Sequence, residues 1–257
     1  MSNSLWENIR DEIGLRVDAE PSLGSFLHSL VLSQKNLTNA VASILSSKLH
    51  SDALSAMDIK KFIIDVFDDC KNIEGDIEKD LIFFKDNDPS CDYFSTPLLF
   101  YKGFHGLATY RASHCLWNKN RHTMALFFQN RSSEIFGIDI HPAAKIAGGV
   151  MMDHATGIVI GETAVIESDG SMCQGVTLGG KGNEVGKRHP NIKSGATIYA
   201  SSTILGNITV GNKAVIAAGS LVLKDVKNET TVAGIPAKEV NKLNISSNDW
   251  DPGDSSL

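Results

Sequence analysis

Two adjacent residues that could do acid–base chemistry, Asp153 and His154, stand in a segment of otherwise apolar and small residues, MMDHATGIVIGE, at positions 151–162. A neutral imidazole, with an ordinary pKa of about 6.5, can take a proton from a hydroxyl group near pH 7. A single histidine is more often a partly buried packing residue. The elements around His154 must therefore decide whether it is a base.

The composition narrows the class of protein. The 257 residues carry a formal net charge of −6 and form no concentrated basic stripe, so nucleic acid is not expected as a partner. The first residues lack the pattern of a signal peptide, and no segment has the roughly 18 apolar residues needed to cross a bilayer. The spacing of the cysteines favours neither a disulfide framework nor a zinc site. We expect a cytoplasmic protein with reduced thiols and no membrane contact. The cysteines are Cys70, Cys91, Cys115 and Cys173.

Residues 1–136 have apolar side chains at helical spacing, which predicts an all-α N-terminal domain. Ser4 opens a capping-box pattern, SLWE, and Pro21 suits the first turn of another helix. Thr96, followed by a proline, predicts the start of a helix that continues through YKGFHGLATYR. A last helix is expected over residues 122–136.

After Gly137 the period changes to six residues, in two runs of mostly aliphatic positions. A helix or an alternating strand would show a different period. Six residues per flat side, with an inward aliphatic residue on each side, are typical of a parallel β-helix of triangular section. Each coil of about eighteen residues buries its aliphatic side chains only by stacking on the next, so about four or five coils are expected. The runs are Ile140, Ile146, Met152, Ile158, Ala164, Gly170, Val176 and Ile192, Ile198, Ile204, Val210, Ile216, Val222.

The two runs are out of step with each other. Sixteen residues separate Val176 from Ile192, four more than two sides of six would use. The segment GGKGNEVGKRHPN between them is rich in glycine and polar residues, which predicts a loop extruded from the coil wall. This loop carries Arg188 and His189, and it is either a place for substrate contacts or an insertion without a role.

Six segments between about residues 86 and 240 form a specific combination. They are DPSCDYFSTPLLFYKGFHGLATYR, FGIDIHPAAKI, MMDHATGIVIGETAVI, GVTLGGKG, KRHPNI and ILGNITVGNKAVIAAGSLVL. In a chain with a helical domain ahead of a hexapeptide-repeat β-helix, these segments resemble the serine O-acetyltransferase family. The resemblance implies an α + β fold, with an α-helical domain (1–136), a left-handed parallel β-helix with one extruded loop (137–243) and a flexible C-terminal tail (244–257).

The resemblance also implies an activity. Members of this family transfer the acetyl group of acetyl-CoA to the hydroxyl of L-serine, which gives O-acetyl-L-serine for cysteine synthesis. L-cysteine is expected to occupy the serine pocket as a feedback inhibitor, because its polar groups are those of serine. The expected assembly is a homotrimer or a dimer of trimers with active sites between subunits. No metal is expected.

The resemblance assigns catalytic roles to His154 and Asp139. His154 would be the general base, and Asp139, from DIHP, would fix the imidazole tautomer and stabilise the imidazolium. The two residues are 15 positions apart, close to one coil of about eighteen. We therefore expect them near the same edge of the β-helix.

Roles in substrate binding come from the same resemblance. Arg188 offers a planar fork for the carboxylate of the amino acid. Asp88 and Asp153 offer negative charge for its ammonium group, and His189 is a further donor. The resemblance also places Pro89, of the pair DP, in the substrate site. Because Asp88 precedes a proline, the alternative role of Asp88 is that of a turn residue at a helix end.

Acetyl-CoA is expected in a groove between coils of neighbouring subunits. Small residues let the pantetheine arm approach the backbone, and Gly180, Ala200 and Ala218 are the candidates. Lys238, in AGIPAKEV, is a candidate for the nucleotide phosphates. No glycine-rich phosphate loop occurs, so ATP or NAD is not expected.

Two features depart from the family pattern. Lys187 precedes RHP where the family often has Asp. The acidic, serine-rich end of the chain finishes in Leu257, whereas the family commonly ends in isoleucine and inserts this end into O-acetylserine sulfhydrylase. Binding of that enzyme through the tail is expected, because a terminal carboxylate and a branched side chain are both present.

Three alternatives stay open from the sequence. A γ-type carbonic anhydrase shares the β-helix and would use His141, His154 and His189 as zinc ligands. A β-helix scaffold without enzymatic activity would bind a partner through its helical domain and would not bind CoA. An acetyltransferase for another hydroxyl acceptor, such as a sugar, would lack a need for the Arg188 and Asp88 contacts.

Overall fold

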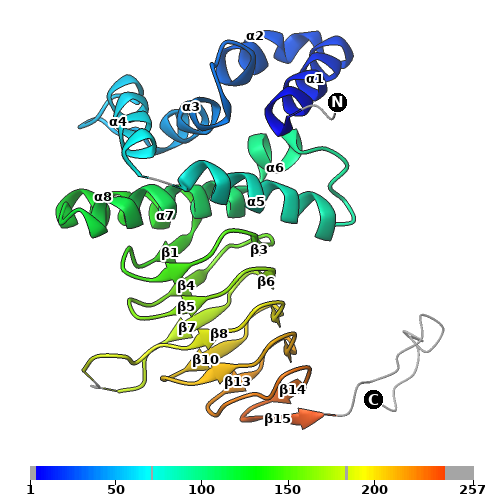
Figure 1. The fold of residues 1–257 in the computed structure, drawn as a ribbon, viewed down its shortest axis with the longest axis vertical. Helices are drawn as coiled ribbons and strands as arrows, with labels where there is room; N and C mark the ends of the chain where they lie inside the picture. Colours follow the sequence, from blue (N-terminus) through cyan, green and yellow to red (C-terminus); the bar gives the residue numbers. More distant parts are fainter. Residues whose placement is uncertain (1–3, 71, 183–184, 241–257) are drawn as a thin grey trace.

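The computed structural model describes residues 4–70, 72–182 and 185–240. Figure 1 shows a layer of helices stacked on the end of a column of short strands. The predicted tail, residues 244–257, and the last three residues of the expected β-helix domain lie outside the described residues. The helices are α1 (Leu5–Ala19), η1 (Pro21–Leu23), α2 (Gly24–Leu27), η2 (His28–Leu32), α3 (Leu37–Leu49), α4 (Ala56–Asp69), α5 (Ile73–Asn87), α6 (Ser95–Phe100), α7 (Lys102–Asn118) and α8 (His122–Phe136). Among the described residues, no helix combines the length and apolar character needed to cross a bilayer.

Local capping signals explain where several helices begin. The capping box at Ser4 is confirmed, because its side chain accepts from the Glu7 N–H and the Glu7 carboxylate accepts from the Ser4 N–H. Pro21 starts a single 3-10 turn, and α8 covers residues 122–136 as predicted. Each of these signals lies within one turn of the helix that it starts, so no distant contact overrides it.

The helix predicted to start at Thr96 is wrong in two respects. The chain forms two helices, α6 and α7, which are separated by the extended backbone of Tyr101. The start of α6 is fixed from a distance, because the Glu12 carboxylate accepts from the N–H groups of Phe94 and Ser95. A carboxylate of α1 therefore satisfies the free donors at this helix end, a role that the sequence assigns to Thr96.

The strands form a column of triangular section with three parallel sheets, which confirms the predicted β-helix. The first sheet has the order β1-β4-β7-β10-β13, the second β11-β8-β5-β2 and the third β15-β14-β12-β9-β6-β3, in which only β15 is antiparallel to its neighbour. The strands are β1 (Ile138–Ile140), β2 (Lys145–Ile146), β3 (Val150–Met152), β4 (Ile158–Ile160), β5 (Val165–Ile166), β6 (Gly170–Met172), β7 (Thr177–Gly179), β8 (Asn191–Ile192), β9 (Thr197–Ile198), β10 (Thr203–Leu205), β11 (Thr209–Val210), β12 (Val215–Ile216), β13 (Leu221–Val222), β14 (Thr231–Gly234) and β15 (Ala237–Val240).

Two edges of this column carry the residues His154 and Arg188. The corners that leave the third sheet and enter the first (153–157, 173–176, 199–202 and 217–220) form the His154 edge. The corners that leave the first sheet and enter the second (141–144, 161–164, 180–190 and 206–208) form the Arg188 edge. Every position of the two six-residue runs is buried, which confirms that they line the interior.

The coils are less regular than a strict period of six. Eight residues separate Met152 from Ile160, whereas six separate Met172 from Leu178, the residues stacked on them. The two extra residues lie at the corner of His154 and Ala155, whose φ angles of 53° and 60° are in the left-handed region. The first corner of the His154 edge is therefore a bulge with His154 on it.

The extruded loop is confirmed, but it is longer than predicted. Fourteen residues separate Leu178 from Ile192, whereas six separate the stacked pair Ile160 and Ile166. The insertion is thus eight residues and not four. The error arises because Leu178, and not Val176, occupies the position that continues into the second run, since Leu178 pairs with Ile204 of that run.

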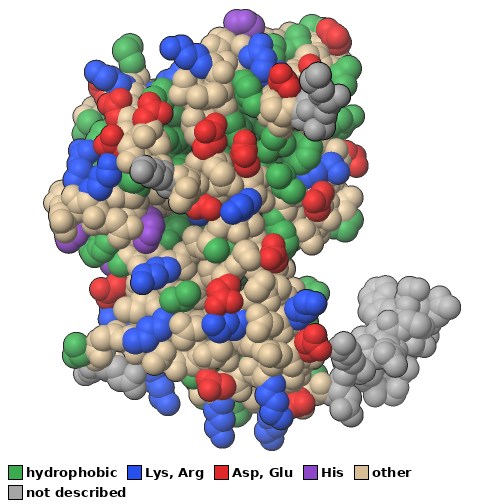
Figure 2. All heavy atoms as spheres, in the orientation of Figure 1, with side chains coloured by type: hydrophobic (Ala, Val, Ile, Leu, Met, Phe, Trp, Pro, Cys, Tyr) green, Lys and Arg blue, Asp and Glu red, His purple; other side chains and the backbone are tan. Residues whose placement is uncertain are grey.

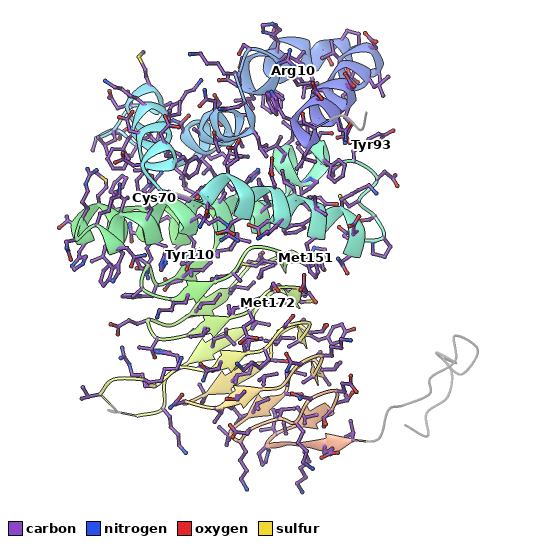
Figure 3. All side chains as sticks on the ribbon, in the orientation of Figure 1. Arg10, Cys70, Tyr93, Tyr110, Met151 and Met172 are labelled. Carbon is purple, nitrogen blue, oxygen red and sulfur yellow. A yellow bond between two sulfur atoms is a disulfide. The ribbon has the colours of Figure 1, made fainter. Side chains whose placement is uncertain are left out.

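Buried polar side chains join the helical layer to the first coil. The guanidinium of Arg111, on α7, forms two hydrogen bonds with the carboxylate of Asp80, on α5, at 2.7 and 2.8 Å. The same carboxylate accepts from the N–H groups of Gly149 and Val150, where β3 begins. Tyr110, which Figure 3 labels at the boundary between helices and coils, donates to the Ala144 carbonyl at 2.6 Å. Two helices therefore fix the backbone that leads into β3 and the His154 bulge.

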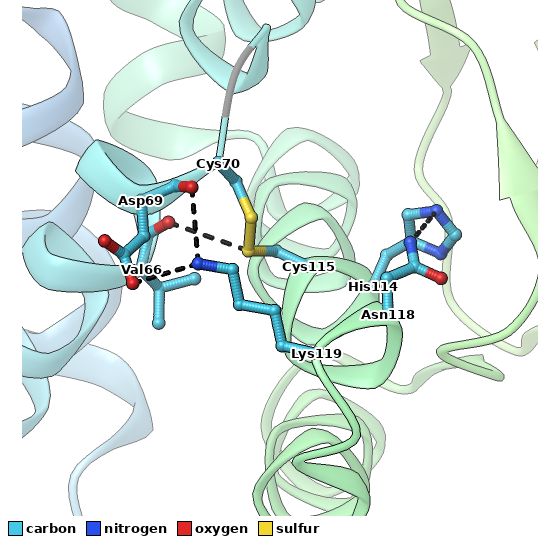
Figure 4. Close-up of a disulfide and its surroundings, with 7 residues drawn as sticks. All are labelled: Val66, Asp69, Cys70, His114, Cys115, Asn118 and Lys119. Atoms are coloured by element: carbon cyan, nitrogen blue, oxygen red, sulfur yellow. Dashed lines mark hydrogen bonds and ion pairs between the residues drawn. A yellow bond between two sulfur atoms is a disulfide. The ribbon is translucent and has the colours of Figure 1, made fainter.

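A disulfide between Cys70 and Cys115 joins the end of α4 to α7 (Figure 4). The expectation that all four cysteines are reduced is therefore wrong for this pair. Widely spaced cysteines gave no local signal, because the Cα atoms come within 6.3 Å of each other only after α4 packs on α7. Beside the disulfide, Lys119 donates to the carboxylate of Asp69 at 2.9 Å. Cys91 and Cys173 are free thiols.

Candidate active site

A cavity of about 400 Å³ opens at the junction of the two layers, beside the His154 bulge. The loop after α5, the start of α7 and the end of β3 each contribute to its wall. The start of α7 and the end of β3 approach each other closely at Gly103. A Cβ atom added to this residue would overlap the backbone carbonyl of Met152. Its lining residues are Asp88, Ser90, Phe100, Tyr101, Lys102, Gly103, Met152, Asp153 and His154.

His154 presents its imidazole to this cavity and to solvent, with 76 % of the side chain exposed. Its Nε2 lies 3.8 Å from a carboxylate oxygen of Asp153. Next to it, the ammonium of Lys102 donates to the hydroxyl of Thr156, which ties the start of α7 to the bulge. An accessible imidazole on a fixed corner can meet a substrate hydroxyl.

Asp88 lies across the cavity and is held by a short loop. Its Oδ1 accepts from the Ser90 N–H at 2.9 Å and from the Ser90 hydroxyl at 2.7 Å. Partial burial would raise the pKa of Asp88, but the hydrogen bonds of Ser90, the Tyr101 hydroxyl and the charge of His154 together lower it. The carboxylate is thus favoured in its charged form, which suits an ammonium ligand.

Asp139 lies on the outer wall of the first sheet, between two buried neighbours on β1. It aligns with Val159 on β4, and its Oδ1 accepts from the amide of Gln129 at 2.7 Å. Among the described residues, no hydrogen bond or ion pair joins Asp139 to His154. The first coil takes 20 residues and not 18, because the bulge at His154 adds two residues between the stacked strands β1 and β4.

A second cluster lies on the Arg188 edge, where the extruded loop folds back on the coil. The Arg188 guanidinium is paired with the carboxylate of Glu162. The hydrogen bond from Arg188 and its positive charge lower the pKa of Glu162, although slight burial opposes this. The pair fixes Arg188 at the base of the loop.

His189 is buried, with 7 % exposed, and its ring covers Gly161 so closely that a Cβ atom there would overlap the imidazole. Its Nδ1 lies 2.9 Å from the hydroxyl of Thr163. Burial and the charge of Arg188 lower the pKa of His189, which favours the neutral ring. Lys187, which stands where the family pattern often has Asp, donates to the Thr163 carbonyl and anchors the loop.

The substrate-site residues predicted from the sequence therefore form two groups in one chain. Asp88, Asp153 and His154 share the cavity, whereas Arg188 and His189 lie on the other edge of the column. Pro89 follows Asp88 in the loop and does not line the cavity.

The candidate acetyl-CoA residues are divided in the same way. Ala200 and Ala218 stack on the His154 edge, where the Gly219 N–H donates to the Ala200 carbonyl at 2.8 Å. Gly180 lies on the Arg188 edge, against the side chains of Arg188 and His189. Lys238 is on β15 at the far end of the column, where Figure 2 shows several basic side chains projecting from the surface.

Sequence reasoning missed Ser90, Tyr101 and Lys102 as residues of this site. Ser90 and Tyr101 lie in the segment DPSCDYFSTPLLFYKG, but their polar contacts depend on how α5, α6 and α7 meet. The described residues contain no group of three or more His, Cys, Asp or Glu side chains arranged for a metal ion. The histidines of the carbonic anhydrase alternative lie on two different edges, with His154 apart from His141 and His189.

Comparisons with known proteins decide the family. The family described as "Serine acetyltransferase, N-terminal" matches residues 5–109. Serine acetyltransferase 2 of Arabidopsis thaliana is 48 % identical over 94 % of this chain and 75 % of its own length. The serine acetyltransferase of Salmonella typhimurium is 48 % identical over 93 % of this chain and 87 % of its own length. The chain belongs to the serine acetyltransferase family. The resemblance inferred from the sequence is thereby confirmed.

Solved serine acetyltransferase structures share the fold over nearly the whole chain. The Neisseria gonorrhoeae enzyme in complex with serine has a TM-score of 0.90 and 46 % identity, covering 93 % of this chain and 98 % of that one. A serine acetyltransferase in complex with CoA has a TM-score of 0.89 and 45 % identity, covering 92 % and 98 %. One in complex with cysteine has a TM-score of 0.91 and 45 % identity, covering 94 % and 100 %.

Proposed function

We propose that this serine acetyltransferase family member transfers the acetyl group of acetyl-CoA to the hydroxyl of L-serine and releases O-acetyl-L-serine and CoA. The observation that carries the proposal is the cavity in which His154 faces two carboxylates, Asp88 and Asp153, in a chain of this family. Similar enzymes were solved with serine, with CoA and with cysteine. A cavity with one base and two carboxylates suits an amino alcohol better than a neutral sugar.

His154 acts as the general base in this scheme. Its neutral imidazole takes the proton of the serine hydroxyl while that oxygen attacks the acetyl carbonyl carbon. The thioester C–S bond then breaks, and the imidazolium returns the proton to the CoA sulfur. No acyl-enzyme forms, because the cavity holds no Ser or Cys paired with His154.

Two carboxylates are candidates to stabilise the imidazolium. Asp153 lies 3.8 Å from His154 Nε2. Asp139, the partner in the family pattern, is held by Gln129 on the coil wall beside the bulge and would need to leave that contact. We retain Asp139 as the proposed dyad partner, with Asp153 assigned to the substrate ammonium. Asp139→Asn should lower kcat by about 10- to 100-fold with little change in the KM for serine, whereas Asp153→Asn should mainly raise that KM.

The carboxylate of serine would be bound by Arg188, with His189 as a second donor. Because these residues lie on the other edge of the column, a complete site requires the His154 edge of one subunit beside the Arg188 edge of the next. This supports a cyclic homotrimer, which helical contacts could double into a dimer of trimers. Glu162 would release Arg188 when the substrate carboxylate takes its place.

Acetyl-CoA would lie along the small residues of the His154 edge, Ala200 and Ala218, with its thioester at His154. Gly180 would approach it from the neighbouring subunit, and Lys238 would meet the nucleotide phosphates at the far end. L-cysteine has the ammonium and carboxylate groups of serine, so it would occupy the same pocket as an inhibitor. Binding of O-acetylserine sulfhydrylase by the tail that ends in Leu257 concerns residues outside those described.

The activity is tested by CoA thiol release with acetyl-CoA and L-serine, measured against a panel of other hydroxyl acceptors that includes sugars. We expect L-serine to be the preferred acceptor, and His154→Ala to lose about 10²- to 10⁴-fold in turnover. A sugar acceptor that outcompetes serine would favour the alternative acetyltransferase. Near-normal turnover of a folded His154→Ala variant would exclude His154 as the base.

The site between subunits has its own test. His154→Ala and Arg188→Ala chains, each inactive alone, are unfolded, mixed in equal amounts and refolded together. Mixed trimers should recover about a quarter of the wild-type activity, because half of the chains carry each intact residue and pairing is random. No recovery from soluble mixed trimers would mean that one chain supplies both residues.

A further inference from the structure

The loop after α5 holds Asp88 by an Asx-turn hydrogen bond and by a second hydrogen bond from a side chain. Ser90 donates to Asp88 Oδ1 through both its backbone N–H and its hydroxyl, at 2.9 and 2.7 Å. Both donors go to the same oxygen, so the other carboxylate oxygen stays available to a ligand. Two fixed hydrogen bonds hold the carboxylate in one orientation, which lowers the entropy cost of meeting a ligand.

Tyr101 extends this arrangement from a different element. It stands at the break between α6 and α7, and its ring packs against Phe84 with centroids 6.1 Å apart. Its hydroxyl lies 3.5 Å from the Ser90 hydroxyl. The Ser90 proton is donated to Asp88, so the Tyr101 O–H faces oxygen atoms of the Ser90–Asp88 pair, and the Tyr101 oxygen can accept from a ligand.

The charged and polar groups around the cavity show which ligand group suits this arrangement. Lys102 also lines the cavity, and its ammonium donates to the hydroxyl of Thr156. Asp88, Ser90, Tyr101 and Asp153 all line the same cavity and present oxygen atoms. The hydrogen bonds of Ser90 and Tyr101 offset the burial of Asp88 and lower its pKa. A primary ammonium group has three donors and one positive charge, which matches two carboxylates and a phenolic oxygen.

We propose that Ser90 and Tyr101 are positioning residues for the α-ammonium group of the amino acid, acting through Asp88, which makes this loop a determinant of substrate specificity. The proposal rests on the proposed function of the cavity. Ser90 fixes the Asp88 carboxylate, and Tyr101 fixes the Ser90 hydroxyl and adds an acceptor. Loss of either hydroxyl leaves the base, His154, in place.

The test uses Ser90→Ala and Tyr101→Phe in the full-length enzyme, with steady-state kinetics in serine and in acetyl-CoA. We expect the KM for serine to rise about 3- to 10-fold in Ser90→Ala, with less than about a 2-fold change in kcat and in the KM for acetyl-CoA. Ser90→Thr keeps a hydroxyl and should restore most of the affinity. Tyr93→Phe removes a hydroxyl from the same loop at a residue that does not line the cavity, so it should behave as wild type.

A second readout separates recognition of the ammonium group from general damage to the loop. Competitive inhibition against serine is measured with L-cysteine and with 3-mercaptopropionate, which lacks the ammonium group. The inhibition constant of L-cysteine should rise with the KM for serine in Ser90→Ala and Tyr101→Phe, whereas that of 3-mercaptopropionate should stay within about 2-fold.

Each outcome has one meaning. Equal effects on both inhibitors would show a structural role and overturn the proposal, as would unchanged constants in both variants. In either of these cases a wild type that acetylates serine leaves the proposed function standing. A wild type that neither acetylates serine nor binds L-cysteine in calorimetry would remove the proposed function, and this inference with it.

Discussion

The buried pair of Asp80 and Arg111 offers the most demanding test of how the two layers are joined. We consider Asp80→Leu, Arg111→Met and the double variant. Asp80 is 1 % exposed and Arg111 5 % exposed, so neither charge can turn to solvent without moving a helix. Asp80 also accepts from the backbone at the start of β3, and Arg111 donates to the carbonyls of Ile146 and Ala147. Arg111 has a second, longer ion pair with the half-buried carboxylate of Asp76, at 3.6 Å.

The expected magnitudes follow from burial. Removal of one member of a buried ion pair costs about 3–5 kcal/mol, because the other charge stays buried and unpaired. Asp80→Leu leaves Arg111 with only the longer contact to Asp76 and leaves the N–H groups of Gly149 and Val150 without their acceptor, so a loss of about 3–5 kcal/mol is expected. The double variant removes both charges and should lose only about 1–3 kcal/mol, from the backbone groups left unpaired. Burial raises the pKa of Asp80 to about 6 against the influence of Arg111, which agrees with a large desolvation cost.

The assay is urea unfolding followed by circular dichroism, at one fixed protein concentration because the chain is expected to assemble. The double-mutant cycle gives the coupling between the two side chains as the double change less the sum of the single changes. The single and double losses given above correspond to a coupling of at least about 3 kcal/mol in favour of the pair. Hydrogen exchange of the Gly149 and Val150 amides should accelerate in Asp80→Leu. Additive single changes with unaltered exchange would refute the view that this pair fixes the entry to β3.

Three further predictions concern single contacts. Dithiothreitol, which reduces the disulfide, should lower the unfolding free energy of the wild type by up to about 4 kcal/mol, the chain-entropy value for a 45-residue loop. The reductant should not affect Cys70→Ser. A wild type that is insensitive to the reductant would show that the disulfide between Cys70 and Cys115 does not form. Because the pKa of Glu162 is lowered in the folded chain, its pair with Arg188 stabilises the fold above the ordinary carboxyl range and is lost as the pH falls. Wild type should therefore lose its stability advantage over Glu162→Gln below about pH 4.5, and a constant difference from pH 7 to pH 3.5 would contradict this. Gly103→Ala should destabilise the chain by about 1–3 kcal/mol through overlap with the β3 backbone, and unchanged urea unfolding would show that the two layers tolerate a wider gap.

The β-helix could be predicted from the sequence, because its six-residue pattern of buried positions repeats along the chain. Each inward position of the two six-residue runs is buried, and the extruded loop appears where the runs lose step. The capping box at Ser4 is equally local. A pattern read along the chain succeeds wherever a residue's environment is set by its neighbours within one turn or one coil.

The candidate site is harder to predict, because its geometry depends on contacts between distant segments. The two extra residues at the His154 corner could not be predicted, because aliphatic residues of the sequence fit either register. The contacts of Ser90 and Tyr101 near Asp88 form only when α5, α6 and α7 pack together, so no local sequence pattern predicts them. The disulfide had no local signal at all.

The last strand among the described residues, β15, bears on how the folded chain avoids aggregation. A stack of parallel coils would otherwise end in a row of unused backbone donors and acceptors, onto which a second column could add. The helices cover one end, and at the other end β15 turns back antiparallel along β14 and closes one of the three sheets. A newcomer would have to pair with a strand of reversed direction, so end-to-end fibre growth is discouraged. A chain cut before β15 should therefore form filaments or precipitate.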